Sequence, residues 1–253
     1  MTENLFDKMA SEYDQMVQEA DRENQFPFAG YNELMNVIAG IISDETQLAK
    51  AKILDLGVGT GTLYQKLPPE KYALYAMDSS EKMLDIARLR LPDANLAQAD
   101  FCLGLPDDFN KEKYDFIVAT YAFHHLDIEH FVDMVEYLIP HLLPYGKILI
   151  GDIMFTNFRE KEQCHQKCAE LWDETEHYHV FSQLIEVMDG SLALSFMKIS
   201  YCAGVMIVDN YGESALQIDD YLIKYNSNTV KWKSSQSGKK ASGRRVQVSQ
   251  KER

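Results

Sequence analysis

Short apolar segments alternate with amphipathic segments along the first half of this chain. A single helix between two successive strands requires a crossover connection, so this alternation predicts a parallel sheet with helices on both faces. Helices are expected at 81–91, ended by Pro92, and at 128–139, which begins after Asp127. The five predicted strands are 52–56, 72–78, 95–101, 114–120 and 147–153.

Patterns outside this region complete the predicted fold. Apolar residues at helical spacing, from Phe6 to Val17 and from Tyr31 to Ile42, predict two helices ahead of the first strand. Two apolar runs, 192–200 and 202–208, are too close together for a crossover helix and predict a hairpin. The sequence therefore predicts an α/β fold: a Rossmann-like, doubly wound, mainly parallel seven-stranded sheet with an antiparallel C-terminal hairpin strand.

Charge is unevenly distributed over the 253 residues. The total is −14, but the stretch from Lys231 onward has eight Lys or Arg and one acid, which leaves −21 for residues 1–230. An acidic body disfavours nucleic acid as a partner, because such binding rests largely on cationic contacts to phosphate. The low apolar content after Val230 predicts a flexible basic tail. We therefore expect one domain over 1–210, with a helical cap at 1–45, and an extension over 211–253.

The sequence patterns also predict a cytoplasmic protein with no membrane partner. Residues 1–10 carry acids and no apolar run, and no apolar stretch reaches the ~18 residues that cross a bilayer. The cysteines are too few for the disulfide framework of a secreted domain, which favours reduced thiols. They are Cys102, Cys164, Cys168 and Cys202.

A glycine-rich loop follows the first predicted strand. The segment Asp-Leu-Gly-Val-Gly-Thr-Gly, residues 55–61, lies before a helix predicted at 63–67, the context of a nucleotide-binding loop. Glycines let backbone approach a ligand closely, and amides at a helix start suit a polar or anionic group. Asp78 ends the second strand, where a carboxylate can accept both ribose hydroxyls, and Asp100 ends the third. Because carboxyl ends of strands form the ligand crevice of an open α/β sheet, we predict a cofactor site there.

These segments resemble the class I S-adenosylmethionine-dependent methyltransferases. The resemblance is carried by 53–61, 77–84, 99–101 and 115–126. The chain is similar in particular to the bacterial YrrT-like methyltransferases, which share an Ala-x-x-Tyr-Asp opening at residue 10, Tyr-Ala-Phe-His-His-Leu at 121 and Glu-Thr-Glu-His-Tyr at 174. The resemblance covers about residues 5–210. It implies methyl transfer from S-adenosylmethionine to a small-molecule acceptor by in-line displacement.

The resemblance also implies a set of cofactor-binding residues. The three loop glycines would lie beneath the methionine part of the cofactor, with Asp55 organising contacts to its ammonium group. Asp78 would hold the ribose, Asp100 and Phe101 the adenine, and Met83 would pack on the base. Tyr13 resembles a residue of a cofactor lid. The complete set is Tyr13, Asp55, Gly57, Gly59, Gly61, Asp78, Ser79, Met83, Asp100, Phe101 and Thr120.

His124 and His125 are the predicted catalytic residues. They follow the fourth strand, next to the place where the methyl group should emerge, although histidines here also serve as helix caps or packing groups. We expect the acceptor pocket between the N-terminal helices, the turn at 121–126 and the segment 172–179. The group around Cys164 and Cys168 lacks the paired spacing of zinc sites, so no metal site is predicted.

Two alternative functions stay open from the sequence. An NAD-dependent oxidoreductase shares the glycine loop and the ribose acid. Here, however, the third glycine comes one position early for Gly-x-Gly-x-x-Gly, and the chain has no Tyr-x-x-x-Lys pair. The other alternative is a regulatory module that binds S-adenosylmethionine without catalysis, because a fold alone does not establish an activity.

Overall fold

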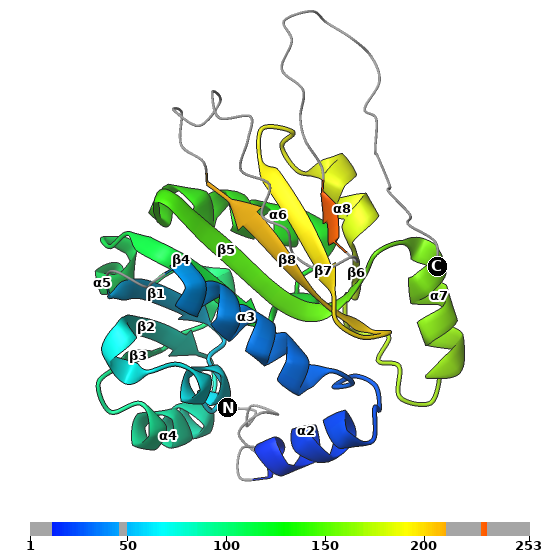
Figure 1. Ribbon diagram of the computed structural model, residues 1–253, viewed down its shortest axis with the longest axis horizontal. Helices are drawn as coiled ribbons and strands as arrows, with labels where there is room; N and C mark the ends of the chain where they lie inside the picture. The colour runs from blue at the N-terminus through cyan, green and yellow to red at the C-terminus, as the bar shows by residue number, and fades with distance from the viewer. Residues whose placement is uncertain (1–11, 46–49, 211–228, 232–253) are drawn as a thin grey trace, which may run out of the picture.

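Nine strands form the centre of the structure, a computed structural model that describes residues 12–45, 50–210 and 229–231. Their bounds are β1 Ala51–Leu56, β2 Tyr72–Asp78, β3 Asn95–Gln98, β4 Tyr114–Thr120, β5 Leu142–Phe155, β6 His179–Val180, β7 Ala193–Lys198, β8 Ala203–Asp209 and β9 Thr229–Lys231. The sheet order is β3-β2-β1-β4-β5-β8-β7-β9, and β6 pairs with β5 (Figure 1). Pairs from β3 to β5 are parallel, whereas β8 is antiparallel to both β5 and β7.

The predicted fold class is confirmed. The five predicted parallel strands and the C-terminal hairpin together form a seven-stranded path from β3 to β7. The short strands β6 and β9 are additions that the sequence patterns did not predict. Because the chain order reverses direction between β1 and β4, the carboxyl ends of these strands border a crevice, as expected for an open α/β sheet.

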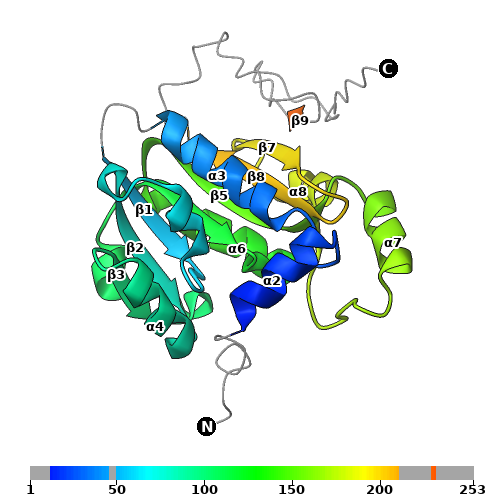
Figure 2. The same cartoon turned by 60° about the horizontal axis from the view of Figure 1, so that its bottom comes forward.

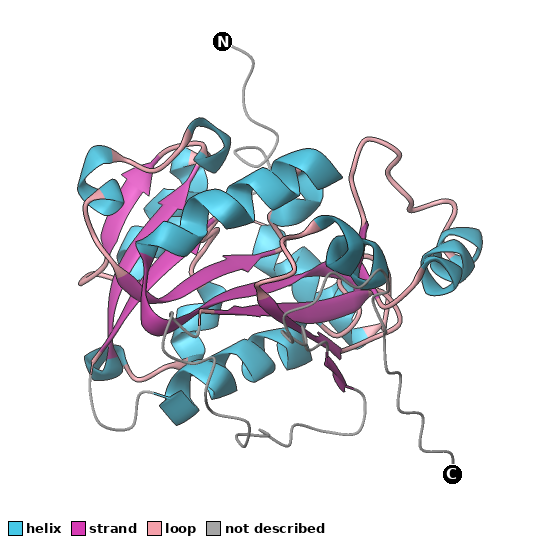
Figure 3. Ribbon diagram, turned by 90° about the horizontal axis from the view of Figure 1, so that it is seen from above, coloured by secondary structure: helices cyan, strands magenta, loops and turns pink. Residues whose placement is uncertain are grey.

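Helices cover both faces of the sheet (Figure 3). Alternate residues of a strand point to opposite faces, so Ile53 packs with α3 and α4, and Leu54 packs with α6 and α8. α2 lies against α3 near one end of the sheet (Figure 2). The α-helices are α2 Tyr13–Arg22, α3 Tyr31–Glu45, α4 Glu81–Arg90, α5 Asp107–Asn110, α6 Ile128–Leu138, α7 Phe158–Lys167 and α8 Phe181–Val187.

Local sequence accounts for the start of α6. The Asp127 side chain accepts a hydrogen bond from His130 N at 2.9 Å, which confirms the predicted cap. The apolar stripe that begins at Phe131 is fully buried against the sheet. Only residues 121–127 separate the end of β4 from the start of α6, so this short segment is held at the carboxyl edge of the sheet.

Several element boundaries differ from the prediction; β5, for example, spans Leu142–Phe155 where the strand was expected at 147–153. The expected helix at 63–67 is a 3₁₀-helix, Thr62–Lys66, because Pro68 forces Leu67 into an extended conformation and leaves no room for an α-helical turn. β3 ends at Gln98, so Asp100 lies beyond the strand and caps a 3₁₀ turn. The first predicted helix is described only from Tyr13 onward, and Phe6 lies outside the described residues.

Within the described ranges, no helix is long and apolar enough to cross a membrane. The predicted basic tail falls almost entirely on residues 232–253, which lie outside the described part of the chain.

A chain truncated after Lys231, the last residue of β9, is expected to keep its thermal unfolding midpoint within about 2 °C, because the cut leaves β9 whole and the removed residues lack an apolar pattern. The opposite charges of tail and body add only an attraction that salt screens. Thermal unfolding of both chains at low and high salt measures this. A fall in the midpoint of more than ~4 °C at high salt would show that the tail belongs to the domain.

Candidate active site

A cavity of about 270 Å³ lies at the carboxyl ends of β1, β2 and β4. Most of the predicted site residues line it, namely Tyr13, Gly57, Gly59, Asp78, Ser79, Met83, Asp100, Phe101, Thr120 and His125. Three predicted residues, Asp55, Gly61 and His124, lie outside its wall. The wall also contains Met35 and Thr60, which the sequence did not single out, and Tyr121, which falls in the turn predicted to border the acceptor pocket.

The glycine loop follows β1 and bends over the end of β2. Gly59 and Gly61 have φ angles of 55° and 79°, a left-handed region that favours glycine. A Cβ atom at Gly59 would meet nothing within 4 Å, whereas one at Gly61 would lie 2.6 Å from Leu91 Cδ1. Gly59 therefore belongs to the open cavity wall, and Gly61 is needed for close packing of the loop on the end of α4.

The Asp78 carboxylate is held by the backbone around it. Oδ2 accepts a hydrogen bond from Gly59 N and Oδ1 accepts one from Ser80 N, both at 2.8 Å. Ser80 in turn caps α4, accepting from Met83 N at 3.2 Å. Each carboxylate oxygen has a second lone pair, so these contacts orient the group and leave it able to accept bonds from a ligand.

Asp55 lies beneath the loop and is 1% exposed. Burial raises the pKa of its carboxyl group to about 7; the nearby Tyr64 hydroxyl opposes this shift and the Asp78 charge adds to it. The Tyr64 hydroxyl lies close enough to lower the pKa of Asp55, but neither it nor Asp55 Oδ1 makes a hydrogen bond of regular geometry among the described residues. A buried acid with an unmatched oxygen is stabilised by a positive charge placed nearby.

Hydrogen bonds and an ion pair join α2 to the glycine loop and to α4 beside the cavity. Asp14 Oδ1 accepts a hydrogen bond from the Thr60 hydroxyl at 2.7 Å, and Asp14 Oδ2 pairs with Arg90 Nη2 at 2.6 Å. Arg90 also donates to the Thr60 carbonyl oxygen at 3.2 Å. These bonds place Tyr13 in the cavity wall, where its ring meets Phe28 edge to face. Asp14 belongs to the Ala-x-x-Tyr-Asp opening, but no role was predicted for this residue from the sequence.

The two histidines lie on a 3₁₀ turn, η4 Phe123–His125, with different environments. The His124 side chain is 12% exposed, and its Nδ1 lies 2.7 Å from Asp152 Oδ1. Asp152 Oδ2 accepts bonds from the backbone N–H groups of Phe123 and His124. Burial alone would raise the pKa of Asp152, but the His124 side chain and the Ile153 N–H lower it overall. Burial likewise lowers the pKa of His124, and Asp152 reverses this to a net rise.

His125 faces the cavity and is positioned by a different acid. Its Nδ1 lies 2.9 Å from Glu176 Oε2, and its side chain is 35% exposed. Neither acid was singled out as catalytic by the sequence, although Glu176 falls in the predicted acceptor segment. The signal for Asp152 is an acid inside the otherwise apolar second half of β5, residues 148–155.

The predicted acceptor segment 172–179 packs against the histidine turn. His177 N donates to the His124 carbonyl oxygen at 2.7 Å. Trp172 stacks on Phe26 with ring centroids 5.4 Å apart, and Tyr178 meets Trp172 edge-on at 4.4 Å. These ring contacts hold the segment against Phe26, and the His177 bond joins it to the histidine turn.

Tyr121 is the most strained residue of the cavity wall. It follows β4 with φ 50°, although it is not glycine. Its ring packs on Tyr31 at 5.2 Å, and its buried hydroxyl has no hydrogen-bond partner among the described residues. Such strain is concentrated at binding and catalytic sites.

Comparisons with known proteins place these features in a family context. A family model described as "Methyltransferase domain" matches residues 53–146. An uncharacterized methyltransferase of Bacillus licheniformis is 32% identical and aligns over 77% of this chain and 91% of its own length. One of Geobacillus sp. is 33% identical over 71% of this chain and 78% of its own length.

Solved structures share the fold. The magnesium protoporphyrin IX methyltransferase of Synechocystis, crystallised with bound SAH, superposes with a TM-score of 0.59. It is 14% identical, and the match covers 81% of this chain and 98% of that chain. The N-methyltransferase NodS of Bradyrhizobium japonicum, in complex with SAH, gives 0.56 at 13% identity over 83% of this chain and 100% of that one.

Proposed function

The chain belongs to the methyltransferase family of these relatives, and on this premise we propose that it transfers a methyl group from S-adenosylmethionine to a small-molecule acceptor by in-line displacement. One observation carries the proposal: a single cavity brings Gly59, Asp78 and Asp100 together at the strand ends and has His125 in the same wall. The sulfonium of the cofactor supplies an already activated methyl group. The work of the protein is therefore to align the acceptor with the methyl group and to exclude water.

The residues present fit this cofactor. Asp78, oriented by two backbone N–H groups, is suited to accept the ribose hydroxyls. Phe101, which stacks on Phe123 at 5.7 Å, offers an aromatic edge for adenine beside Asp100. The buried carboxyl group of Asp55, beneath the glycine loop, would be stabilised as a carboxylate by the positive charge of the methionine ammonium group.

The acceptor side is built mostly from aromatic rings. Tyr13, Tyr31 and Tyr121 line the cavity, where their rings would exclude water from the reacting groups. His125, held by Glu176, is the side chain placed to take a proton from an acceptor that carries one. His124 lies behind His125 and pairs with Asp152. Because Asp152 also binds the backbone of the η4 turn, this pair helps to position the turn that carries His125.

Two experiments test the proposal. Calorimetry is expected to detect binding of S-adenosylmethionine and of its demethylated product, and stronger binding of NAD would overturn the assignment. Radiolabelled S-adenosylmethionine incubated with a panel of small metabolites is then expected to label at least one of them. Binding without transfer to any metabolite would favour the regulatory alternative.

Asp78→Ala is expected to weaken cofactor binding by roughly 1.5 to 3 kcal/mol, the scale of hydrogen bonds to a charged group. Calorimetric titration of wild type and variant with S-adenosylmethionine measures this. Asp85→Ala is the matched control, because Asp85 is an exposed acid on α4 that pairs with Arg88 at 2.8 Å. If Asp78→Ala binds S-adenosylmethionine as tightly as the control variant does, Asp78 does not contribute to cofactor binding.

A further inference from the structure

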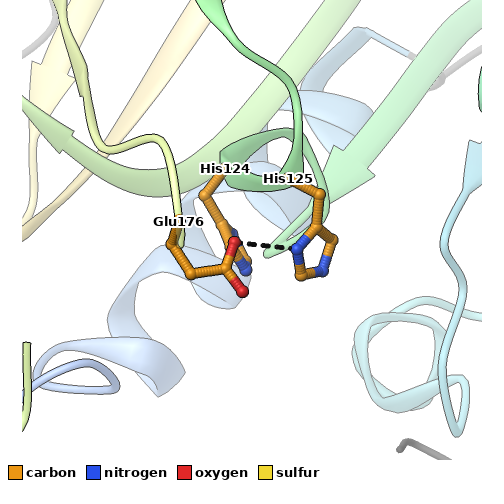
Figure 4. Close-up of side chains that lie close together, drawn as sticks. All are labelled: His124, His125 and Glu176. Carbon is orange, nitrogen blue, oxygen red and sulfur yellow. Dashed lines mark hydrogen bonds and ion pairs between the residues drawn. The ribbon is translucent and has the colours of Figure 1, made fainter. Parts of the chain in front are cut away.

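We propose that His124, His125 and Glu176 bind one divalent transition-metal ion of the zinc type. One ring nitrogen of each histidine and one carboxylate oxygen of Glu176 lie within 4.8 Å of one another. In Figure 4 the three side chains point toward a common centre, two from the η4 turn and one from the segment that leads to β6. Among the described residues, this is the group of His, Cys, Asp and Glu side chains that meets this spacing.

The distances between the three candidate ligand atoms are close to those in an occupied metal site. Zinc holds nitrogen and oxygen ligands at about 2.0 to 2.2 Å, so ligand atoms on a tetrahedron are about 3.4 Å apart. His125 Nδ1 and Glu176 Oε2 are 2.9 Å apart, joined by a hydrogen bond that the ion would replace. A closure of at most about 1.4 Å between the farthest atoms of the group completes the geometry, and the partly exposed His125 and Glu176 side chains can provide it.

The surroundings orient the ligands as in known metal sites. His124 uses Nδ1 to bond the buried Asp152, which leaves Nε2 as the nitrogen directed away from that carboxylate. Asp152 is itself fixed by backbone N–H groups of Phe123, His124 and Ile153. A carboxylate that holds the second nitrogen of a ligating histidine is the usual outer partner of such an ion. The His177 bond to the His124 carbonyl oxygen ties the Glu176 segment to the turn.

The ligand types select the class of ion. Two imidazoles and one carboxylate suit zinc and similar transition metals, whereas magnesium and calcium prefer oxygen ligands only. Three protein ligands leave at least one coordination position open. Since His125 also lines the cavity, that position faces the place where, if the proposed function holds, the acceptor lies. An oxygen, nitrogen or sulfur atom bound there would lose its proton more readily.

Metal binding can be tested without any acceptor. The full chain is treated with a chelator, dialysed and titrated with Co²⁺ and then Zn²⁺, with binding followed by visible absorption and by elemental analysis. We expect one ion per chain, and Co²⁺ bands without the charge-transfer absorption of thiolate ligands. His125→Ala and Glu176→Gln are each expected to lower the affinity by more than the ~10- to 100-fold that loss of an outer partner costs. His165→Gln is the control, because His165 faces Glu174 at 3.3 Å in a similar pair.

Each outcome decides the proposal. A chain that takes up no ion, a thiolate signature from the cysteines, or variants that bind like the control would overturn it. Glu176→Gln preserves the shape of a partly exposed side chain, so its circular dichroism spectrum should match wild type even if His125→Ala perturbs the turn. Calorimetry with S-adenosylmethionine on the same metal-free samples keeps the two proposals separate. If the chain binds the cofactor but no metal, the metal proposal is rejected and the proposed function is unaffected.

Discussion

Replacing His125 by glutamine is expected to lower methyl-transfer turnover by ~10²-fold or more while the cofactor affinity stays unchanged. The imidazole lies in the cavity wall and is held at 2.9 Å from Glu176, so it is already oriented before any ligand binds. Glutamine keeps a polar group of similar reach but can neither take a proton nor replace the ring as a strong metal ligand. Turnover is measured with radiolabelled S-adenosylmethionine and an acceptor from the metabolite panel, and affinity by calorimetry.

His130→Gln is the matched control for this prediction. His130 also pairs with a carboxylate, Asp127 Oδ1 at 2.8 Å, but both side chains are exposed and lie outside the cavity. Its turnover is expected to equal that of wild type. If His125→Gln and His124→Gln both behave like the control, the histidines are structural and catalysis proceeds by alignment alone.

A chelator distinguishes the two roles that an imidazole can have here. Treatment of wild type with a chelator should abolish turnover if His125 holds an ion, and should leave turnover intact if His125 takes the acceptor proton directly. Loss of activity in His125→Gln is expected in both cases, so the histidine prediction and the metal proposal can fail separately.

The cofactor end of the site could be predicted from sequence because its determinants are local. The glycine loop directly follows β1, and Asp78 is the last residue of β2. In a parallel sheet these positions meet at one edge whatever the rest of the chain does. Even so, Asp100 lies two residues past the end of β3, a boundary that the strand pattern did not resolve.

The acceptor end could not be predicted in the same way, because its contacts join distant segments. Glu176 lies 51 residues from His125, and Asp152 lies 28 residues from His124. No periodicity connects such positions. Pairing of β5 with β4 brings Asp152 beside the η4 turn, and packing of the segment before β6 on that turn brings Glu176 to His125. The sequence therefore predicted the two histidines as catalytic residues and predicted no metal site. Their pairing with Asp152 and Glu176 could be seen only in the tertiary structure.

Asp55→Asn is expected to change how stability depends on pH. In the folded, ligand-free chain burial raises the pKa of Asp55 to about 7, whereas an aspartate in an unfolded chain has a pKa of about 3.9. Between these pH values the folded chain keeps a proton that the unfolded chain has released. The contribution of Asp55 to the free energy of unfolding is therefore complete below about pH 4 and is lost as pH rises through about 7. The total change is roughly 4 kcal/mol.

Asparagine cannot ionise, so the free energy of unfolding of the variant is expected to lack the pH dependence that Asp55 causes. Denaturant unfolding of both chains from pH 4 to pH 8 measures it, and the stability of Asp55→Asn relative to wild type should increase by about 4 kcal/mol across that range. The difference between the two curves removes the contribution of the histidines, which titrate in both chains. Parallel curves would show that Asp55 is ionised throughout in the folded chain.

The same carboxyl group should link cofactor binding to pH with the opposite sign. A positive ammonium group near Asp55 favours the carboxylate, so S-adenosylmethionine binds better once the proton has left. With a pKa of about 7 in the free protein, the affinity of wild type is expected to rise ~10-fold between pH 6 and pH 8. In Asp55→Asn that rise should disappear and the affinity should stay low at both pH values. An equal rise in both chains would mean that Asp55 does not sense the ammonium group, and its buried, unmatched oxygen would then belong to the fold rather than to the cofactor site.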